Sequence, residues 1–185
     1  MSFDVAADAY DRFMGRWSRQ LSAPLADFAG VAAGMRALDV GCGPGALTGE
    51  LVDRLGADAV AAVDPAEGFV AALRARHPDV AASRAAAEAL PFADDAFDAA
   101  LAQLVVHFMA DPVAGLTEMA RVTRPGGTVA ACVWDLGGAT GPLSTFWAAV
   151  QDLEPDSTGE SMRPGAREGH LAVSVVQEGL IRIRG

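Results

Sequence analysis

The chain has 185 residues, enough for one domain with a substantial core, and 51% of them are hydrophobic, which excludes a largely disordered protein. Its formal net charge of −10 comes from 14 basic and 24 acidic residues and opposes binding to nucleic acid or to anionic membranes. Two cysteines without metal-ligand spacing, no basic-then-apolar leader and no apolar run of roughly 18 residues predict a cytoplasmic protein with no metal site, disulfide framework or membrane span.

Strand-like and helix-like segments alternate along the chain. A helical lead-in is expected before residue 35, and Asp111 and Pro112 have the residue types that favour the N-cap and first turn of a helix. The glycines after Pro125 are expected to turn the chain into the last strand. The predicted strands are 35–40, 59–64, 79–85, 96–105 and 128–134, and the predicted helices are 46–55, 67–76 and 111–122.

Five strands that alternate with helices predict an α/β fold, namely a doubly wound, mostly parallel sheet with helices on both faces. We expect one domain with a helical cap over 1–34, a core over 35–136 and a C-terminal segment over 137–185, where the pattern loosens. In such sheets ligands bind at the carboxyl ends of the strands. The functional residues are therefore sought just after each predicted strand.

The first of these strand ends carries the sequence "LDVGCGPGALTGEL", in which Gly41, Gly43 and Gly45 occupy alternate positions before a helix. Glycine accepts positive φ and allows another group to approach the backbone closely, and the helix N-terminus adds free N–H groups. Three glycines at this point predict a small polar ligand above the turn.

Two ligand classes fit this stretch. "GCGPGA" satisfies the dinucleotide pattern G-x-G-x-x-G/A, which favours a nicotinamide cofactor, whereas Asp39 in D-x-G-x-G-x-G favours a ligand with an ammonium group. Asp64 ends the second strand 64 − 45 = 19 residues after the last glycine, where a carboxylate can accept both ribose hydroxyls of either ligand. Pro65 is expected to pack on an adenine ring.

Four ordered motifs then carry a resemblance. "LDVGCGPGALTGEL", "AAVDPAEGFV", "AAAEALPFADDAFDAAL" and "EMARVTRPGGTVA" resemble the class I S-adenosylmethionine-dependent methyltransferases, and within them the small-molecule group related to ubiquinone and menaquinone biosynthesis. The likeness covers roughly residues 8–150 and implies a Rossmann-like sheet and S-adenosylmethionine as cofactor. The residues that it assigns to cofactor binding are Asp39, Gly41, Cys42, Gly43, Asp64, Pro65, Ala86, Ala87 and Gln103.

The resemblance also implies the reaction, which is transfer of a methyl group to a small, partly apolar metabolite. Because the sulfonium is already activated, the protein has only to align the acceptor, and no nucleophile is assigned. His107 is the candidate general base for a phenol or amine acceptor. The remaining candidates for the acceptor pocket are Tyr10, Arg16, Trp134 and Asp135.

Two further functions remain open at this point. A nicotinamide-dependent oxidoreductase is motivated by "GCGPGA" and Asp64, although a chain without lysine lacks a Tyr-x-x-x-Lys pair. A non-catalytic S-adenosylmethionine-binding module is motivated by Ala86, which stands where the family often has Asp or Asn, and by a C-terminal segment that is short for the family. That segment leaves the edge of the sheet incomplete, which predicts a homo-oligomer paired through the last strand.

Overall fold

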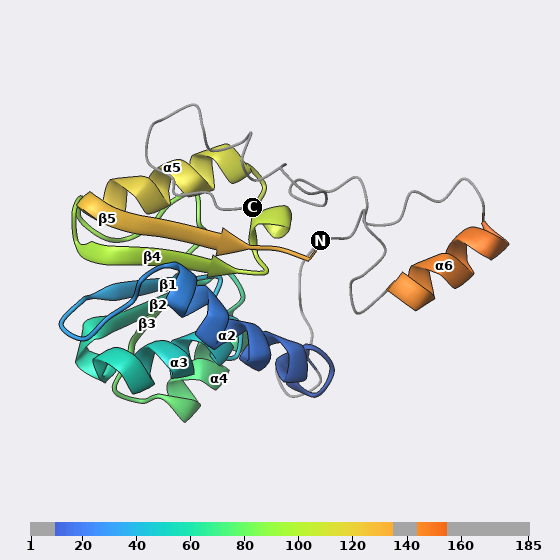
Figure 1. Cartoon of the computed structure of the whole chain (residues 1–185), viewed down its shortest axis with the longest axis horizontal. Coiled ribbons are helices and arrows are strands. Elements are labelled where there is room, and N and C mark those ends of the chain that lie inside the picture. The colour runs from blue at the N-terminus through green and yellow to red at the C-terminus, as the bar shows by residue number, and fades with distance from the viewer. Residues whose placement is uncertain (1–9, 135–143, 155–185) are drawn as a thin grey trace.

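The computed structural model describes residues 10–134 and 144–154 (Figure 1). A π-helical turn, η1 (Asp11–Gly15), leads into α2 (Arg16–Phe28). The later helices are α3 (Ala46–Leu55), α4 (Glu67–Arg76), α5 (Pro112–Val122) and α6 (Ser144–Leu153), with 3-10 turns η2 (Ala57–Ala59) and η3 (Val106–Phe108). The strands are β1 (Ala37–Val40), β2 (Val60–Asp64), β3 (Ala81–Arg84), β4 (Phe97–Gln103) and β5 (Thr123–Cys132).

The five strands form one sheet in the order β3-β2-β1-β4-β5, and all four pairings are parallel. Ala37 of β1 lies between Val60 of β2 and Ala99 of β4. The chain winds outward from β1 to β3 and then returns to place β4 and β5 on the other side. This confirms the predicted doubly wound sheet and puts its topological switch point between β1 and β4.

Helices cover both faces of the sheet, as Figure 1 shows. One hydrophobic cluster joins the sheet to α2, α3 and α4 through side chains that include Leu25, Leu47 and Leu73. The other joins it to α5 through Leu116 and Met119. Because strand residues alternate between faces, β1 supplies both clusters, with Ala37 on the first and Leu38 and Val40 on the second.

Local sequence signals explain several element ends. Helices α3 and α4 have the predicted bounds, and α3 follows Gly45, which has a positive φ of 97°. The carboxylate of Asp111 accepts hydrogen bonds of 3.0 Å from the backbone N–H groups of Val113 and Ala114. The predicted N-cap of α5 is therefore confirmed.

The predicted start of the fifth strand at residue 128 was wrong. Strand β5 begins at Thr123, which pairs with Phe97, whereas Thr128 pairs with Ala99. The segment 124–127, which includes the expected glycine turn, bulges out of the register between these two pairs. Pairing with a distant strand extends β5 backwards, and a local pattern does not contain this information.

None of the described helices is long and apolar enough to cross a membrane. Helix α6 has no buried residue. Within the described residues β5 forms one edge of the sheet. The predicted shortened strand and its open edge belong to residues 155–185 and lie outside the described part of the chain.

Candidate functional site

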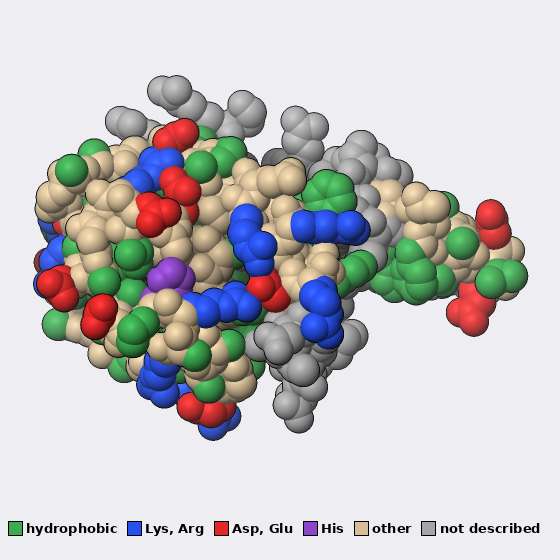
Figure 2. Space-filling view, turned by 90° about the horizontal axis from the view of Figure 1, so that it is seen from below, with side chains coloured by type: hydrophobic (Ala, Val, Ile, Leu, Met, Phe, Trp, Pro, Cys, Tyr) green, Lys and Arg blue, Asp and Glu red, His purple; other side chains and the backbone are tan. Residues whose placement is uncertain are grey.

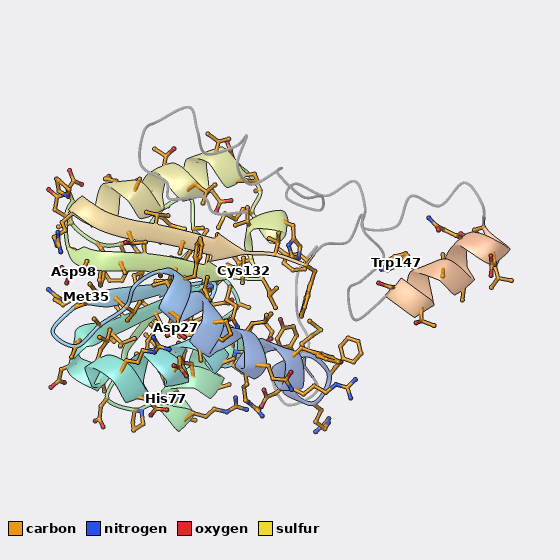
Figure 3. All side chains as sticks on the ribbon, in the orientation of Figure 1. Asp27, Met35, His77, Asp98, Cys132 and Trp147 are labelled. Carbon is orange, nitrogen blue, oxygen red and sulfur yellow. The ribbon has the colours of Figure 1, made fainter. Side chains whose placement is uncertain are left out.

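A cavity of about 340 Å³ opens at the carboxyl ends of the strands. Its walls come from the glycine-rich turn after β1, the end of β2, the start of α4, and the segments after β3 and β4. Asp98 and Met35 mark the opposite end of the sheet in Figure 3. The sequence-predicted residues that line the cavity are Tyr10, Gly41, Gly43, Asp64, Pro65, Ala86, Ala87 and Gln103.

The three glycines of the turn have φ values of 72°, 50° and 97° at Gly41, Gly43 and Gly45, a region that side chains rarely adopt. Their surroundings differ. A Cβ atom on Gly41 would lie 2.5 Å from Cγ1 of Val105 and closer still to Cγ2, whereas a Cβ on Gly43 would meet nothing within 4 Å. Gly41 thus makes room for a neighbouring side chain, and Gly43 faces open space.

Asp64 is held across the glycine turn. Its Oδ2 accepts a hydrogen bond of 2.9 Å from the N–H of Gly43, and its Oδ1 accepts one of 2.8 Å from the N–H of Ala66. Burial raises the pKa of this carboxyl group, and the two N–H donors oppose the rise. Each oxygen retains a lone pair for a further donor, so the fixed carboxylate can accept two hydroxyl groups.

Gln103 presents an unused acceptor. Its Nε2 donates a hydrogen bond of 2.9 Å to the carbonyl of Ser18 in α2, which fixes the orientation of the amide. Its Oε1 is buried and has no hydrogen-bond partner among the described residues. Because an unpaired buried oxygen is unfavourable, this atom is suited to a ligand that carries N–H donors, such as an ammonium group.

Tyr10 closes one side of the cavity. Its ring centroid lies 5.2 Å from that of Phe69 in the first turns of α4, and both rings line the cavity. Burial raises the pKa of Tyr10, and the nearby charge of Asp64 raises it further. The phenol therefore stays neutral at physiological pH and contributes an apolar wall with a polar tip.

Asp39 and Cys42 do not line the cavity. Asp39 is 1% exposed, its Oδ2 accepts a 2.6 Å hydrogen bond from Oγ1 of Thr48 in α3, and its Oδ1 has no partner among the described residues. Burial raises the pKa of Asp39 to about 7, and Asp64 adds to the rise. The Cys42 thiol packs in the α3-side hydrophobic cluster, and burial raises its pKa too.

Three of the remaining acceptor-pocket candidates, Arg16, His107 and Trp134, are not among the residues that line the cavity. Arg16 is exposed and places its guanidinium 5.1 Å from the ring centroid of Trp17. His107 is buried in η3, with its ring 4.0 Å from that of Phe108, and Trp134 is half-buried after β5. Asp135 falls outside the described residues.

Sequence reasoning missed about half of the cavity wall. Leu104 has a positive φ of 63°, which is rare for a residue with a side chain, and it turns the backbone after β4 so that both it and Val105 line the cavity. Glu88 accepts hydrogen bonds from the N–H groups of Ala110 and Asp111 and joins two wall segments. The only signal for Glu88 in the sequence was that it begins the motif "EALPF". The other missed residues are Ala66, Phe69, Phe108, Met109 and Ala110.

Clusters of possible metal ligands were sought among the described residues. Over residues 10–134 and 144–154, no group of three or more His, Cys, Asp or Glu side chains is placed to hold a metal ion. The polar atoms that face the cavity are instead suited to hydroxyl and N–H donors.

Comparison with known proteins identifies relatives of this architecture. Residues 38–131 match the family model described as a methyltransferase domain. An uncharacterised methyltransferase of Mycobacterium bovis is 42% identical over 135 residues, which are 73% of this chain and 52% of that protein. A demethylmenaquinone methyltransferase of Beutenbergia cavernae is 38% identical over 125 residues, 68% of this chain and 50% of that protein.

A solved structure extends the likeness in fold. The methyltransferase of Haloferax volcanii, solved in complex with the activator Trm112, superposes with a TM-score of 0.76 at 23% identity, covering 97% of this chain and 76% of that one. The chain spans about half the length of the curated relatives above.

Proposed function

The chain belongs to the class I S-adenosylmethionine-dependent methyltransferases, and from that premise we propose that it binds S-adenosylmethionine in the cavity around Asp64 and transfers its methyl group to a small, partly apolar acceptor. The observation that carries this proposal is the Asp64 carboxylate. Two backbone N–H groups hold it in place, and it lines the same cavity as Tyr10. It is thereby prepared to accept the two hydroxyls of a ribose.

The same hydrogen bonds argue against a dinucleotide. In a dinucleotide-binding turn the backbone near the second glycine approaches the pyrophosphate, and the helix N-terminus supplies N–H donors. Here the N–H of Gly43 is already bonded to Oδ2 of Asp64, so a diphosphate at this turn would lose that donor and meet the Asp64 carboxylate. This arrangement disfavours the oxidoreductase alternative.

The residues of the cavity fit the cofactor, which when bound supplies a methyl group already activated as a sulfonium. We assign Oδ1 and Oδ2 of Asp64 to the ribose hydroxyls and the unpartnered Oε1 of Gln103 to the ammonium group. Pro65 and the backbone at Ala86 and Ala87 would border the adenine, and no side chain there accepts from its amino group. Tyr10 and Phe69 would exclude water from this half of the site.

The acceptor is proposed by chemical class. Apolar side chains after β4, among them Leu104, Val105 and Met109, line the cavity and favour an acceptor with an apolar part. Because one relative is named a demethylmenaquinone methyltransferase, a demethylmenaquinone-type ring is the first acceptor to test. His107 is not part of the cavity wall, so we propose no general base from the described residues.

Further aspects of function remain proposals. The net charge of −10 supports a small-molecule acceptor rather than nucleic acid, and the reduced state expected for Cys42 and Cys132 supports a cytoplasmic location. Self-association through the C-terminal segment stays a prediction, because residues 155–185 lie outside the described part of the chain. A module that binds S-adenosylmethionine without catalysis is distinguished from a methyltransferase only by an assay of methyl transfer.

Parallel titrations with S-adenosylhomocysteine and NADH test the proposal by calorimetry. We expect the first to bind and the second not to bind. Asp64→Ala should weaken S-adenosylhomocysteine at least about tenfold, since charge-assisted hydrogen bonds contribute roughly 1.5–3 kcal/mol each. Asp58→Ala, an exposed aspartate before the same strand, is the matched control and should bind normally. Tight NADH binding, or an unchanged affinity of Asp64→Ala, would refute the assignment.

A further inference from the structure

The N-terminal helical segment is attached to α4 beside the cavity at two points. The ring of Tyr10 lies against Phe69, and the carboxylate of Asp11 forms an ion pair of 2.8 Å with Arg76 at the other end of α4. Tyr10 and Asp11 are adjacent in the chain, whereas Phe69 and Arg76 are two helical turns apart. Two adjacent residues of the segment thus contact α4 near both of its ends, and these contacts determine where Tyr10 closes the cavity.

Arg76 joins three parts of the site. One terminal nitrogen of its guanidinium donates a 2.9 Å hydrogen bond to the carbonyl of Pro44 in the glycine turn, and the other reaches Oδ2 of Asp11. Arg19 of α2 approaches the same carboxylate at 2.7 Å. Figure 2 shows arginine side chains gathered around acidic ones on the face formed by α2, α3 and α4.

Gly15 provides the space for this arrangement. A Cβ atom on Gly15 would lie 2.9 Å from Cγ of Asp11 and closer still to Oδ1. The Asp11 side chain thus folds over the bare backbone of Gly15, which brings its carboxylate within reach of Arg19 and Arg76 at once. The backbone of Gly15 is helical, with φ of −59°, so helical geometry alone does not require a glycine here.

We propose that Asp11 and Arg76 form a latch that holds Tyr10 over the cavity and slows the departure of the bound ligand. Arg76 is then a positioning residue, since it acts through Asp11 and through the glycine turn. The identity of the ligand as S-adenosylmethionine or its product rests on the proposed function, but the latch itself does not. The N-terminal segment would open when the pair breaks, and the cavity would lose its Tyr10 wall.

The exposure of the pair sets the expected size of the effect. The side chains of Asp11, Arg76 and Arg19 are 16%, 37% and 58% exposed, so solvent screens their interaction. Pairs of this kind are individually weak, although a network of several charges is stronger. We therefore expect about a threefold to tenfold faster dissociation when the latch is broken, and a smaller difference at high salt.

Three variants break the latch in different ways. Asp11→Asn removes the charge, Arg76→Met removes both of its hydrogen bonds, and Gly15→Ala displaces the Asp11 carboxylate without changing any charge while favouring the helix. Asp27→Asn is the matched control, because Asp27 lies in α2, which continues from η1, and the substitution breaks its 2.7 Å ion pair with Arg54 of α3 (Figure 3). Thermal unfolding of each variant shows whether the fold is retained, and the charge-swapped pair Asp11→Arg with Arg76→Asp tests for rescue.

Two measurements follow the latch. The first is the rate of trypsin cleavage after Arg12 and Arg16, both exposed, with the products identified by mass spectrometry. The second is the dissociation rate of S-adenosylhomocysteine by surface plasmon resonance. The three variants should raise both rates, Asp27→Asn should raise neither, and the charge swap should restore both in part.

The outcomes separate the latch from the proposed function. Faster cleavage in the variants, with no S-adenosylhomocysteine binding even by the unchanged protein, would uphold the attachment of the segment and refute the proposed function. Binding with unchanged dissociation in all three variants would overturn the latch, whether or not cleavage is faster. A Gly15→Ala protein that folds, binds and behaves like the unchanged chain would likewise overturn it.

Discussion

Gly41 and Gly43 have similar left-handed backbones, but a methyl group added at each position would meet different surroundings. At Gly41 the methyl would overlap both methyl groups of Val105, whereas at Gly43 it would enter open space beside the cavity. Alanine at either site has a backbone cost of about 1–2 kcal/mol. At Gly41 alone an overpacking cost of about 1–3 kcal/mol is added. Gly41→Ala should therefore unfold more easily than Gly43→Ala.

Removing the methyl groups of Val105 separates these two costs. In the double variant Gly41→Ala with Val105→Ala the overlap is relieved, so the coupling free energy should favour the pair by about 1–3 kcal/mol. In the matched cycle of Gly43→Ala with Val105→Ala the coupling should be close to zero. Chemical denaturation of the parent, the three single variants and the two double variants gives both cycles. Calorimetry with S-adenosylhomocysteine should show weaker binding for Gly43→Ala.

The result that would refute this reasoning is equal coupling in the two cycles, or coupling below about 0.5 kcal/mol in the Gly41 cycle. Either outcome would mean that Val105 does not occupy the space that Gly41 leaves. Both glycines would then have to be explained by the ligand or by backbone conformation alone.

Three further predictions follow from the site. The pKa of Asp39 is raised to about 7 in the folded protein, so the folded state retains its proton where the unfolded chain has lost it. Stability from this group is complete below about pH 4 and decreases by up to about 1.4 kcal/mol per pH unit toward pH 7. Denaturation at pH 5 and pH 8 should show a larger loss in the parent than in Asp39→Asn, in which the raised pKa of Asp64 still contributes. Leu104→Gly should be more stable than Leu104→Ala by about 1 kcal/mol in urea denaturation, because φ is positive there, and the opposite order would contradict the left-handed geometry. Gln103→Met should weaken S-adenosylhomocysteine by about tenfold in calorimetry through loss of the unpartnered Oε1, and unchanged affinity would remove this residue from the site.

Most elements of the fold could be predicted from the sequence, because their local signals agree with the tertiary packing. The bounds of α3 and α4 and the cap at Asp111 could be predicted because glycine, proline and capping residues act within one turn of the helix. The start of β5 could not be predicted, since Thr123 joins the strand through pairing with Phe97. The spacing of hydrophobic residues likewise did not predict the π-helical turn η1.

The residues of the site likewise fall into those that local sequence predicts and those that tertiary packing determines. Asp64 could be predicted because its distance from the glycines follows from one helix and one strand of ordinary length. Asp39 and Cys42 were assigned to the ligand by motif. Alternation along β1 directs Asp39 toward Thr48 of α3, and the glycine turn after β1 places Cys42 in the hydrophobic cluster on the same side, away from the cavity. Val105 and Phe69 reach the cavity through tertiary packing, and no motif in the sequence marks them.

Side chains from three elements support the conformation of the glycine turn. Val105 fills the space over Gly41, the carboxylate of Asp64 binds the N–H of Gly43, and the guanidinium of Arg76 binds the carbonyl of Pro44. Three different elements thus hold neighbouring residues of one turn, so its left-handed conformations are set before binding. A ligand that enters has little backbone left to order, and more of its interaction energy is retained as affinity. On this argument, variants that loosen any one of the three contacts should weaken binding even when the altered residue lies outside hydrogen-bonding distance of the ligand.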